Sequence, residues 1–505
     1  MSDASPPQDR SQDHDGPGKP QEEPREEKVQ TRHTLVIDGH PIHYTATAGT
    51  LILRDEDQKP QATLFYIAYT QDHVSDPGTR PITFSFNGGP GSSSVWMHLG
   101  LLGPRVVQLR EDGSVPPPPY RLVPNPHSLL DRSDLVFIDP VSTGYSRPAP
   151  GQEAQIFHGY QKDIESVGEF IRLYTTRNGR WASPKFLIGE SYGTTRAAGL
   201  AGHLQDRHGM VLNGIMLVSA ILNFQTARFV VGNDLPYILF LPTYTATAWY
   251  HRRLPAELQE RPLREVLAQV EAFATTDYAL GLLKGDAIVP QERRALVAQL
   301  ARFTGLDPDY VERSHLRISI HRFTKELLRD RRRTVGRLDT RFVGIDRDAA
   351  GETFEHDPSY SAIQGLYTAT LNDYLRRELR YESDLPYEIL LPLYQKWDYS
   401  EFQNQYLNVA ETLRAAMSKN PYLQVFVANG YYDLATPYFA TEYTVNHMAL
   451  DPALRGNIRM GYYEAGHMMY VHPPSLAQLK TDLAAFVDAA TQPDRADPLG
   501  MLPGP

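Results

Sequence analysis

Alternating hydrophobic and polar residues characterise the first part of the chain. Residues 33–55 and 62–71 follow this period-two pattern, which is typical of half-buried antiparallel strands, and Asp38-Gly39 supplies a turn between two of them. Shorter and more continuously apolar runs follow, and they indicate buried strands at 81–86, 134–140, 185–188, 213–220 and 422–428.

Helical periodicity appears between these apolar runs. Apolar residues recur at helical spacing over 160–177, and helices are also expected from 192 to about 208, over 401–419 and over 475–490. Because the strands alternate with helices, we predict a mainly parallel sheet covered on both faces.

A change of character divides the chain. Between about 225 and 400 the sequence is largely helical, charged and poor in strand signals. We therefore expect one α/β domain with a largely helical cap inserted into it. We expect a disordered polar tail at 1–31 and an α/β core formed by 32–225 and 400–490. The cap would take up 226–399, and a C-terminal tail 491–505.

Composition narrows the possible partners. The 505 residues carry a net charge of −10, which disfavours nucleic acid and anionic membrane surfaces as partners. No uncharged run reaches the roughly 18 residues of a membrane helix, and the first 30 residues lack the apolar core of a signal peptide. We expect no membrane or nucleic-acid partner and a cytoplasmic protein, or a periplasmic or secreted one if the start is misassigned. A homodimer remains open.

The residue types also restrict the chemistry. The chain has no cysteine, so disulfides, cysteine nucleophiles and thiolate metal sites are excluded. No metal-ligand spacing such as His-Glu-x-x-His occurs, and we expect neither a metal nor a cofactor.

The stretch GESYG, residues 189–193, suggests a nucleophile. A Gly-x-Ser-x-Gly pattern between a strand and a helix fits a sharp turn that lifts the serine hydroxyl above the sheet edge. The pattern alone is weak, but Ser191 follows an apolar strand and precedes a helix-compatible segment. Glu190 is unexpected here, because a hydrolase must stabilise negative charge next to its serine.

A serine nucleophile needs a base, and the base needs an acid to orient it. Asp433 follows the strand at 422–428, and His467 follows the short strand IRMGYYE, in the order that α/β hydrolases use. An aspartate after a strand is often only a turn or helix cap, and His472 is a nearby rival. Order and setting favour the triad of Ser191, Asp433 and His467.

The glycine-rich stretch from Asn87 to Gly91 follows the strand at 81–86. It could be a tight turn, and a phosphate loop fits poorly because no Gly-Lys-Ser/Thr follows. An oxyanion hole fits its place after an early strand, with the second N–H donated by the residue after the nucleophile, Tyr192.

Six motifs in this order resemble the serine carboxypeptidase family: NGGPGSSS, GLLGPR, DLVFIDPVSTGYS, IGESYG, NGYYDLATP and AGHMMYVHPP. The resemblance covers about 80 to 490 and is weak in the insertion. It implies an α/β-hydrolase fold with a helical cap, and removal of C-terminal amino acids from peptides by Ser191, Asp433 and His467. The N–H groups of Gly89 and Tyr192 would form the oxyanion hole.

The resemblance also gives Glu190 a role. Together with Asn87 and the N–H of Gly88, it would bind the terminal carboxylate of the substrate. A neutral carboxylic acid can donate a hydrogen bond to that group, whereas an ionised one repels it. Burial beside an anion raises a carboxyl pKa, so we predict that peptide affinity falls as the pH rises through the pKa of Glu190.

Three features depart from the family pattern. Ser92 stands where relatives have a disulfide-bonded cysteine, and Leu101 stands where they have a second glutamate that shares a proton with the first. The missing signal peptide differs from vacuolar and secreted relatives and suggests an intracellular bacterial-type branch or a misassigned start. Without the second acid, an acidic pH optimum is less secure.

Two other functions are compatible with the same residues. An esterase or acyltransferase would use the same triad, but Asn87, Gly88 and Glu190 favour a peptidase. A non-catalytic protein on a hydrolase fold is disfavoured by the intact triad and glycine loop.

Overall fold

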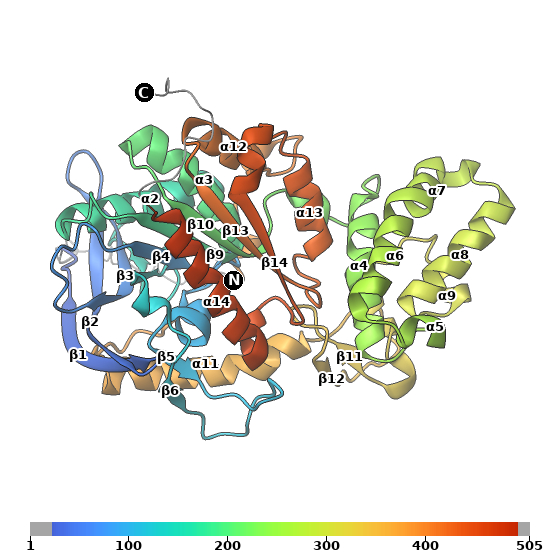
Figure 1. Cartoon of the computed structure of the whole chain (residues 1–505), viewed down its shortest axis with the longest axis horizontal. Helices are drawn as coiled ribbons and strands as arrows, with labels where there is room; N and C mark the ends of the chain where they lie inside the picture. Colours follow the sequence, from blue (N-terminus) through green and yellow to red (C-terminus); the bar gives the residue numbers. More distant parts are fainter. Residues whose placement is uncertain (1–22, 493–505) are drawn as a thin grey trace, which may run out of the picture.

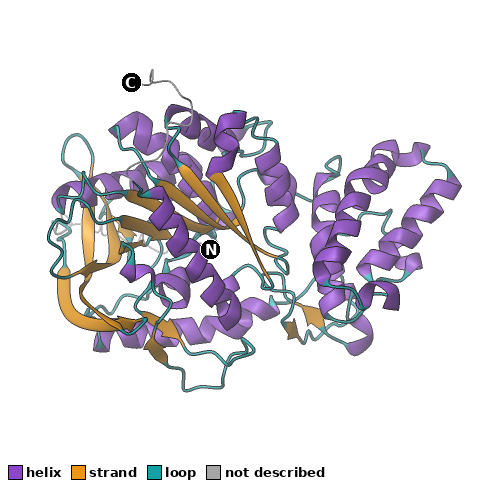
Figure 2. Cartoon of the chain, viewed as in Figure 1, coloured by secondary structure: helices purple, strands orange, loops and turns teal. Residues whose placement is uncertain are grey.

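A ten-stranded mixed sheet runs through the main body of the protein (Figures 1 and 2). The computed structural model describes residues 23–492. Along the sheet, the strand order is β1-β2-β3-β7-β4-β9-β10-β13-β14, and β8 (Arg147–Pro148) pairs with β3. The main strands are β1 (Lys28–Ile37), β2 (His40–Arg54), β3 (Pro60–Gln71), β4 (Ile82–Phe86), β7 (Asp134–Ile138), β9 (Lys185–Ser191), β10 (Gly214–Ala220), β13 (Gln424–Gly430) and β14 (Ile458–Tyr463).

The sheet changes from antiparallel to parallel at β7. Neighbouring strands pair antiparallel from β1 through β2 and β3 to β7. From β7 onward all neighbours are parallel, in the order β7, β4, β9, β10, β13 and β14. The parallel strands β4, β7, β10 and β13 are wholly buried, because helices cover both of their faces, whereas the edge strand β14 is partly exposed. This confirms the predicted α/β class with a mainly parallel sheet.

The edge strand β1 begins earlier than expected. Lys28 already pairs with Gly49, so the expectation of a disordered tail up to residue 31 is wrong for residues 28–31. The long strand β2 offers backbone partners along its whole edge, and pairing with it orders a segment whose composition is that of a tail. Residues 1–22 of the expected tail, and 493–505 of the C-terminal one, lie outside the described residues.

Helices cover the two faces of the sheet. On one face, buried residues of α2 (Tyr160–Arg177), α3 (Tyr192–His208) and α12 (Ala410–Lys419) join a cluster with strand residues such as Phe84. On the other, α11 (Pro358–Arg377) and α14 (Pro473–Ala490) pack with residues such as Phe137. Helix α2 has the predicted bounds, but the helix expected over 401–419 begins only at Ala410, after a 3-10 turn at Ser400–Phe402.

A helical lobe stands beside the sheet, next to β14 and α13 (Tyr438–Asn446) in Figure 1. Its core joins helices α4 to α10 with Tyr432, Leu434 and Tyr438 of the main body. The lobe helices are α4 (Leu235–Tyr250), α5 (Ala256–Gln259), α6 (Leu263–Phe273), α7 (Ala279–Lys284), α8 (Pro290–Thr304), α9 (Pro308–Arg313) and α10 (Ile320–Glu326).

The insertion expected at 226–399 divides between two cores. The lobe carries its own apolar cluster, whereas Leu366, Tyr367 and Leu371 of α11 are buried in the cluster beneath the main sheet. Charge and weak strand signals extend through both parts, so the sequence pattern did not separate them. The remaining short elements are α1 (Val95–Met97), β5 (Arg105–Val107), β6 (Leu122–Pro124), β11 (Thr334–Val335) and β12 (Val343–Gly344).

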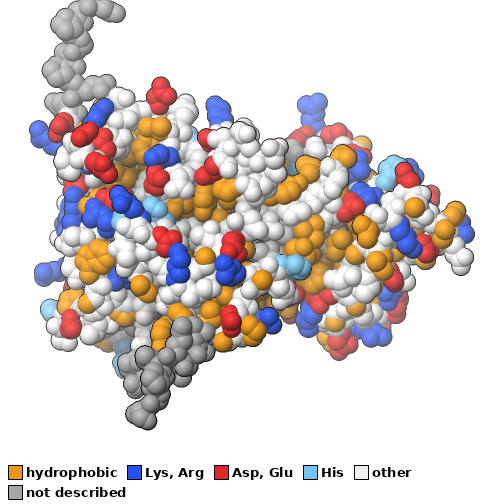
Figure 3. Space-filling model, turned by 90° about the horizontal axis from the view of Figure 1, so that it is seen from above, with side chains coloured by type: hydrophobic (Ala, Val, Ile, Leu, Met, Phe, Trp, Pro, Cys, Tyr) orange, Lys and Arg blue, Asp and Glu red, His pale blue; other side chains and the backbone are white. Residues whose placement is uncertain are grey.

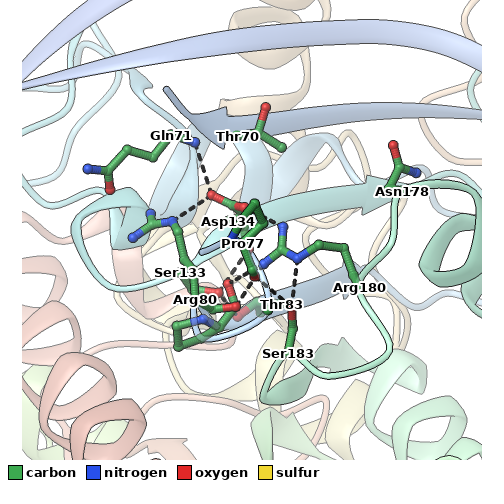
Figure 4. Close-up of polar contacts among 12 residues, drawn as sticks. Thr70, Gln71, Pro77, Arg80, Thr83, Ser133, Asp134, Asn178, Arg180 and Ser183 are labelled. Carbon is green, nitrogen blue, oxygen red and sulfur yellow. Dashed lines mark hydrogen bonds and ion pairs between the residues drawn. The ribbon is translucent and has the colours of Figure 1, made fainter. Parts of the chain in front are cut away.

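A buried ion cluster ties the amino ends of the central strands together (Figure 4). The Asp134 carboxylate, at the start of β7, accepts hydrogen bonds from Arg80 Nε at 2.7 Å and from an Arg180 terminal nitrogen at 2.5 Å. Arg180 Nε also donates to Ser183 Oγ at 2.7 Å, just before β9 begins. The side chains of Asp134 and Arg180 are each only 5% exposed, so the charges are satisfied inside the protein rather than by water.

Acidic and basic side chains are interspersed over the main body and the lobe on the face drawn in Figure 3. Within residues 23–492, no helix is both long enough and apolar enough to cross a membrane.

Candidate active site

Ser191 sits in a strained turn between β9 and α3. Its backbone has φ 59° and ψ −128°, a conformation that is costly for a residue with a side chain. The flanking glycines make the turn possible: a Cβ on Gly189 would lie 2.1 Å from the Gly193 carbonyl oxygen, and one on Gly193 would lie 2.7 Å from that of Phe86. Ser191 therefore has the predicted strand–turn–helix setting of a nucleophile.

Asp433 and His467 meet beyond the carboxyl ends of β13 and β14. The His467 ring Nδ1 lies 2.7 Å from the Asp433 Oδ2, and both side chains are buried. Asp433 also accepts from the backbone N–H groups of Ala435 and Thr436, at 2.7 and 3.1 Å. Because β9, β10, β13 and β14 are neighbouring parallel strands, the pair lies at the same sheet edge as Ser191.

Thr436 was not anticipated from the sequence. Its hydroxyl donates to Asp433 Oδ2 at 2.7 Å, so this carboxylate oxygen is held by both the threonine and the histidine. The sequence does contain a signal for this contact. Thr436 lies three residues after Asp433 in the NGYYDLATP motif, and a hydroxyl at that spacing commonly closes a local turn.

The charges of the pair support each other. Burial alone raises the pKa of Asp433, but the His467 charge and the hydrogen bonds from His467 and Thr436 bring it below its ordinary value. Burial alone lowers the pKa of His467, but the Asp433 carboxylate and, further away, Glu190 raise it above the usual value. The charged, imidazolium form of His467 is thereby stabilised.

The rival histidine has a different environment. His472 Nδ1 lies 2.8 Å from Ser475 Oγ, at the start of α14. His467, and not His472, is therefore the one that the structure places on Asp433.

The glycine loop after β4 packs directly on the nucleophile turn. A Cβ on Gly88 would lie 2.4 Å from the backbone nitrogen of Tyr192 and 2.7 Å from the Glu190 carbonyl oxygen, so only glycine permits this contact. Gly89 follows with φ +102°, a conformation that also favours glycine. The structure thus brings together the loop of Gly88 and Gly89 and the start of α3, which carry the two expected oxyanion donors.

Glu190 points into the protein, next to the serine. Its side chain is buried, with Oε1 accepting from Asn87 Nδ2 at 2.8 Å and Oε2 accepting from the Tyr470 hydroxyl at 2.6 Å. Burial raises the pKa of Glu190 to about 7, although the His467 charge and the two hydrogen bonds oppose the increase. This carboxyl group can therefore change its protonation state near neutral pH.

Asn87 is itself held in place. Its Oδ1 accepts from the Met97 backbone N–H at 3.2 Å, which leaves the amide nitrogen directed at Glu190. Its carbonyl oxygen accepts from Arg196 at 2.7 Å, and Arg196 pairs with Asp163 in the core.

The departures from the family pattern at Ser92 and Leu101 have local explanations. Ser92 Oγ accepts from the Trp96 indole N–H at 2.9 Å and donates to the Ser93 carbonyl oxygen, so a hydrogen bond occupies the place of a disulfide. Leu101 is buried in the apolar cluster beneath the sheet. We expected Glu190 to lack a proton-sharing partner, and its partners are instead the neutral donors Tyr470 and Asn87.

The segment between β11 and β12, which follows the helices of the lobe, contacts the loops that carry Asp433 and His467. The Leu434 N–H donates to the Arg337 carbonyl oxygen at 3.0 Å, and the His467 N–H donates to that of Leu338 at 2.6 Å. The Asp339 carboxylate accepts from the Gly466 N–H at 3.2 Å. The insertion therefore helps to fix the loops that carry the acid and the base.

Comparison with known proteins finds a family that resembles part of the chain. Residues 41–254 match the family model described as serine carboxypeptidase, and this segment contains Asn87, Glu190 and Ser191. This part of the chain is similar to the serine carboxypeptidase family. Asp433 and His467 lie outside the matched segment, so their pairing is evidence of a different kind, from the fold itself.

Curated relatives agree with the serine carboxypeptidase match. The chain is 30% identical over 190 residues to carboxypeptidase Y from Candida albicans, which covers 37% of this chain and 29% of that protein. It is 27% identical over 178 residues to serine carboxypeptidase-like 46 from Arabidopsis thaliana, covering 34% and 35%. The aligned part thus spans only about a third of the length of these relatives.

A solved carboxypeptidase shares the fold over most of the chain. The crystal structure of KEX1, a prohormone-processing carboxypeptidase from Saccharomyces cerevisiae, superposes with a TM-score of 0.55 and covers 88% of this chain and 92% of that one. At 15% identity the likeness concerns the architecture alone. The chain has the α/β-hydrolase fold, as predicted.

Proposed function

We propose that this protein is a serine-type carboxypeptidase that hydrolyses the C-terminal peptide bond of peptides. The observation that carries the proposal is the buried Glu190 carboxyl group, which is hydrogen-bonded to Asn87 and adjacent to Ser191 in a segment similar to the serine carboxypeptidase family. A carboxyl group at that place can, when protonated, donate a hydrogen bond to the terminal carboxylate of a peptide.

Bond cleavage uses the triad. His467 removes the proton from the Ser191 hydroxyl, whose oxygen attacks the scissile carbonyl carbon, and Asp433 stabilises the imidazolium. The backbone N–H groups of Gly89 and Tyr192 stabilise the oxyanion. His467 then gives the proton to the leaving amine, which departs as the C-terminal amino acid, and water hydrolyses the acyl-enzyme by the same steps.

Recognition of the C-terminus uses the neighbouring groups. Asn87, the N–H of Gly88 and Glu190 receive the substrate's terminal carboxylate. Protonated Glu190 donates a hydrogen bond to that anion, whereas ionised Glu190 repels it. Because the pKa of Glu190 is about 7, this interaction weakens as the solution becomes alkaline.

Glu190 and His467 titrate as an interacting pair. Each one's charge favours the charged form of the other. Catalysis needs the opposite arrangement, with Glu190 protonated and His467 neutral. A bound substrate carboxylate stabilises the protonated form of Glu190.

A labelling and digestion experiment tests the proposal. We expect a fluorophosphonate to label Ser191 and the label to be lost in His467→Ala. Mass spectrometry of a digested peptide library should show stepwise loss of residues from the C-terminus. Labelling without C-terminal trimming would instead indicate an esterase or acyltransferase, and failure to label would indicate a non-catalytic protein.

A further inference from the structure

A tyrosine hydroxyl holds the second oxygen of Glu190. Tyr470 belongs to the 3-10 turn Met469–Val471, just after the catalytic histidine, and its hydroxyl donates to Glu190 Oε2 at 2.6 Å. The side chain is buried, and burial followed by the nearby Glu190 charge places the pKa of Tyr470 far above its ordinary value. Tyr470 is therefore a neutral donor in the pH range in which Glu190 titrates.

The structure assigns Tyr470 as a positioning residue that holds the Glu190 carboxyl group and sets the pH range in which the enzyme recognises a peptide C-terminus. This inference rests on the proposed carboxypeptidase function. It adds a residue that acts through Glu190 and that touches neither the scissile bond nor the triad in our scheme.

The surrounding backbone is shaped for this ring. A Cβ on Gly100 would lie 2.5 Å from two ring carbons of Tyr470 and 2.6 Å from the Tyr367 hydroxyl oxygen. Gly100 lies in the π-helical turn His98–Leu102, so a missing side chain in that turn gives Tyr470 the space to reach Glu190. The Tyr470 hydroxyl is thus fixed by its hydrogen bond to Glu190, and the Tyr470 ring by its packing against Gly100.

Tyr367 provides a natural comparison within the same cluster. It comes from α11, its ring packs against Trp96, and its buried hydroxyl has no hydrogen-bond partner among the described residues. Glu190 affects the pKa of both tyrosines, but only Tyr470 donates to its carboxylate.

The groups that face Glu190 determine in which direction its pKa moves when the Tyr470 hydrogen bond is lost. The titratable ones are His467 and Asp433 from the catalytic loops, Tyr470 from its 3-10 turn and Tyr367 from α11, and Asn87 is a neutral amide. The Tyr470 hydrogen bond favours the ionised carboxylate and lowers the pKa of Glu190. Removing it leaves Glu190 Oε2 with one donor fewer, so Glu190 stays protonated to higher pH.

The test compares Tyr470→Phe with Tyr367→Phe. We expect Tyr470→Phe to move the alkaline limb of kcat/KM for a free-acid peptide upward by about one pH unit or more, since a hydrogen bond to a charged group is worth at least about a tenfold change in an ionisation constant. Tyr367→Phe should leave that limb in place, because its hydroxyl donates to no carboxylate.

A second readout does not depend on turnover. The infrared carbonyl band of protonated Glu190, assigned as the band absent from Glu190→Gln, should disappear at higher pH in Tyr470→Phe than in the parent. An unshifted band, or equal shifts in both phenylalanine variants, would overturn the role of Tyr470. A shifted band together with equal rates on free-acid and amide peptides would uphold Tyr470 and refute the carboxypeptidase proposal.

Discussion

Glu190 combines burial, two neutral donors and a pKa near neutrality at the side of the nucleophile. A permanently ionised carboxylate at this place would oppose both the oxyanion and a substrate C-terminus. A carboxyl group that is protonated in the working range avoids both costs and supplies a donor. In the proposed carboxypeptidase, this one residue links the pH of the solution to the choice of substrate.

Glu190→Gln tests this link directly. Glutamine cannot ionise, so the fall of kcat/KM above about pH 7 on free-acid peptides should disappear. The negative charge that raises the pKa of His467 is also removed, and the acidic limb should therefore move to lower pH. The measurement is kcat/KM across the pH range.

Glu442→Gln is the matched control. Glu442 is another partly buried acid with a raised pKa and a tyrosine donor, Tyr462 at 2.5 Å, but it lies in α13. It should keep the parent profile, and an unchanged profile in Glu190→Gln would contradict the role given to Glu190.

At the scale of elements, the junction of the β4 loop with the start of α3 places the oxyanion donors. Gly88→Ala would insert a methyl group 2.4 Å from the Tyr192 nitrogen and push the two segments apart. Loss of one oxyanion donor lowers kcat by about 10²–10³-fold, and we expect a decrease of this order. KM for a free-acid peptide should also rise, because the Gly88 N–H belongs to the proposed carboxylate site. Steady-state kinetics measures both.

Gly456 serves as the control for that substitution. A Cβ there would meet nothing within 4 Å, so Gly456→Ala should keep parental kinetics. If Gly88→Ala retained parental kcat, the contact would not be part of the oxyanion site.

At the amino ends of the central strands, Asp134 is the carboxylate partner of two arginines. Asp134→Ala would leave Arg80 and the buried Arg180 without their carboxylate partner. Breaking a buried ion pair from one side costs about 3–5 kcal/mol in free energy of unfolding, and we expect that loss in urea denaturation. Asp206→Ala, which removes a pair with exposed Lys419, should cost no more than about 1 kcal/mol.

At the scale of the whole molecule, the insertion supports the loops that carry Asp433 and His467. The contacts come from residues 337–339, which follow the helices of the lobe. Asp339→Ala removes the acceptor of the Gly466 N–H and the partner of Arg341. We expect a lower kcat, because the His467 loop loses its support, but an unchanged preference for free-acid over amide peptides. Asp384→Ala, which removes a surface ion pair with Arg376, should change neither. An Asp339→Ala enzyme with parental kcat would refute the supporting role of Asp339.

The sequence predicted the features that local patterns encode. Helix α2 and the strands flanking Ser191 are periodic, and the glycines of the turn reveal the nucleophile. Tyr470 could not be found this way, because its partner Glu190 lies 280 positions away in the chain. The packing of α11 under the sheet was missed for a similar reason, since no local pattern tells a helix which of two cores it joins.

The most direct measurement of the proposed function compares a blocked dipeptide with its C-terminal amide at pH 6 to 8. The two differ only in the group that Glu190, Asn87 and Gly88 are proposed to bind. We predict that the free acid is cleaved much faster at the acidic end and that the ratio falls as Glu190 ionises near pH 7. Equal rates on acid and amide at every pH would contradict the carboxypeptidase.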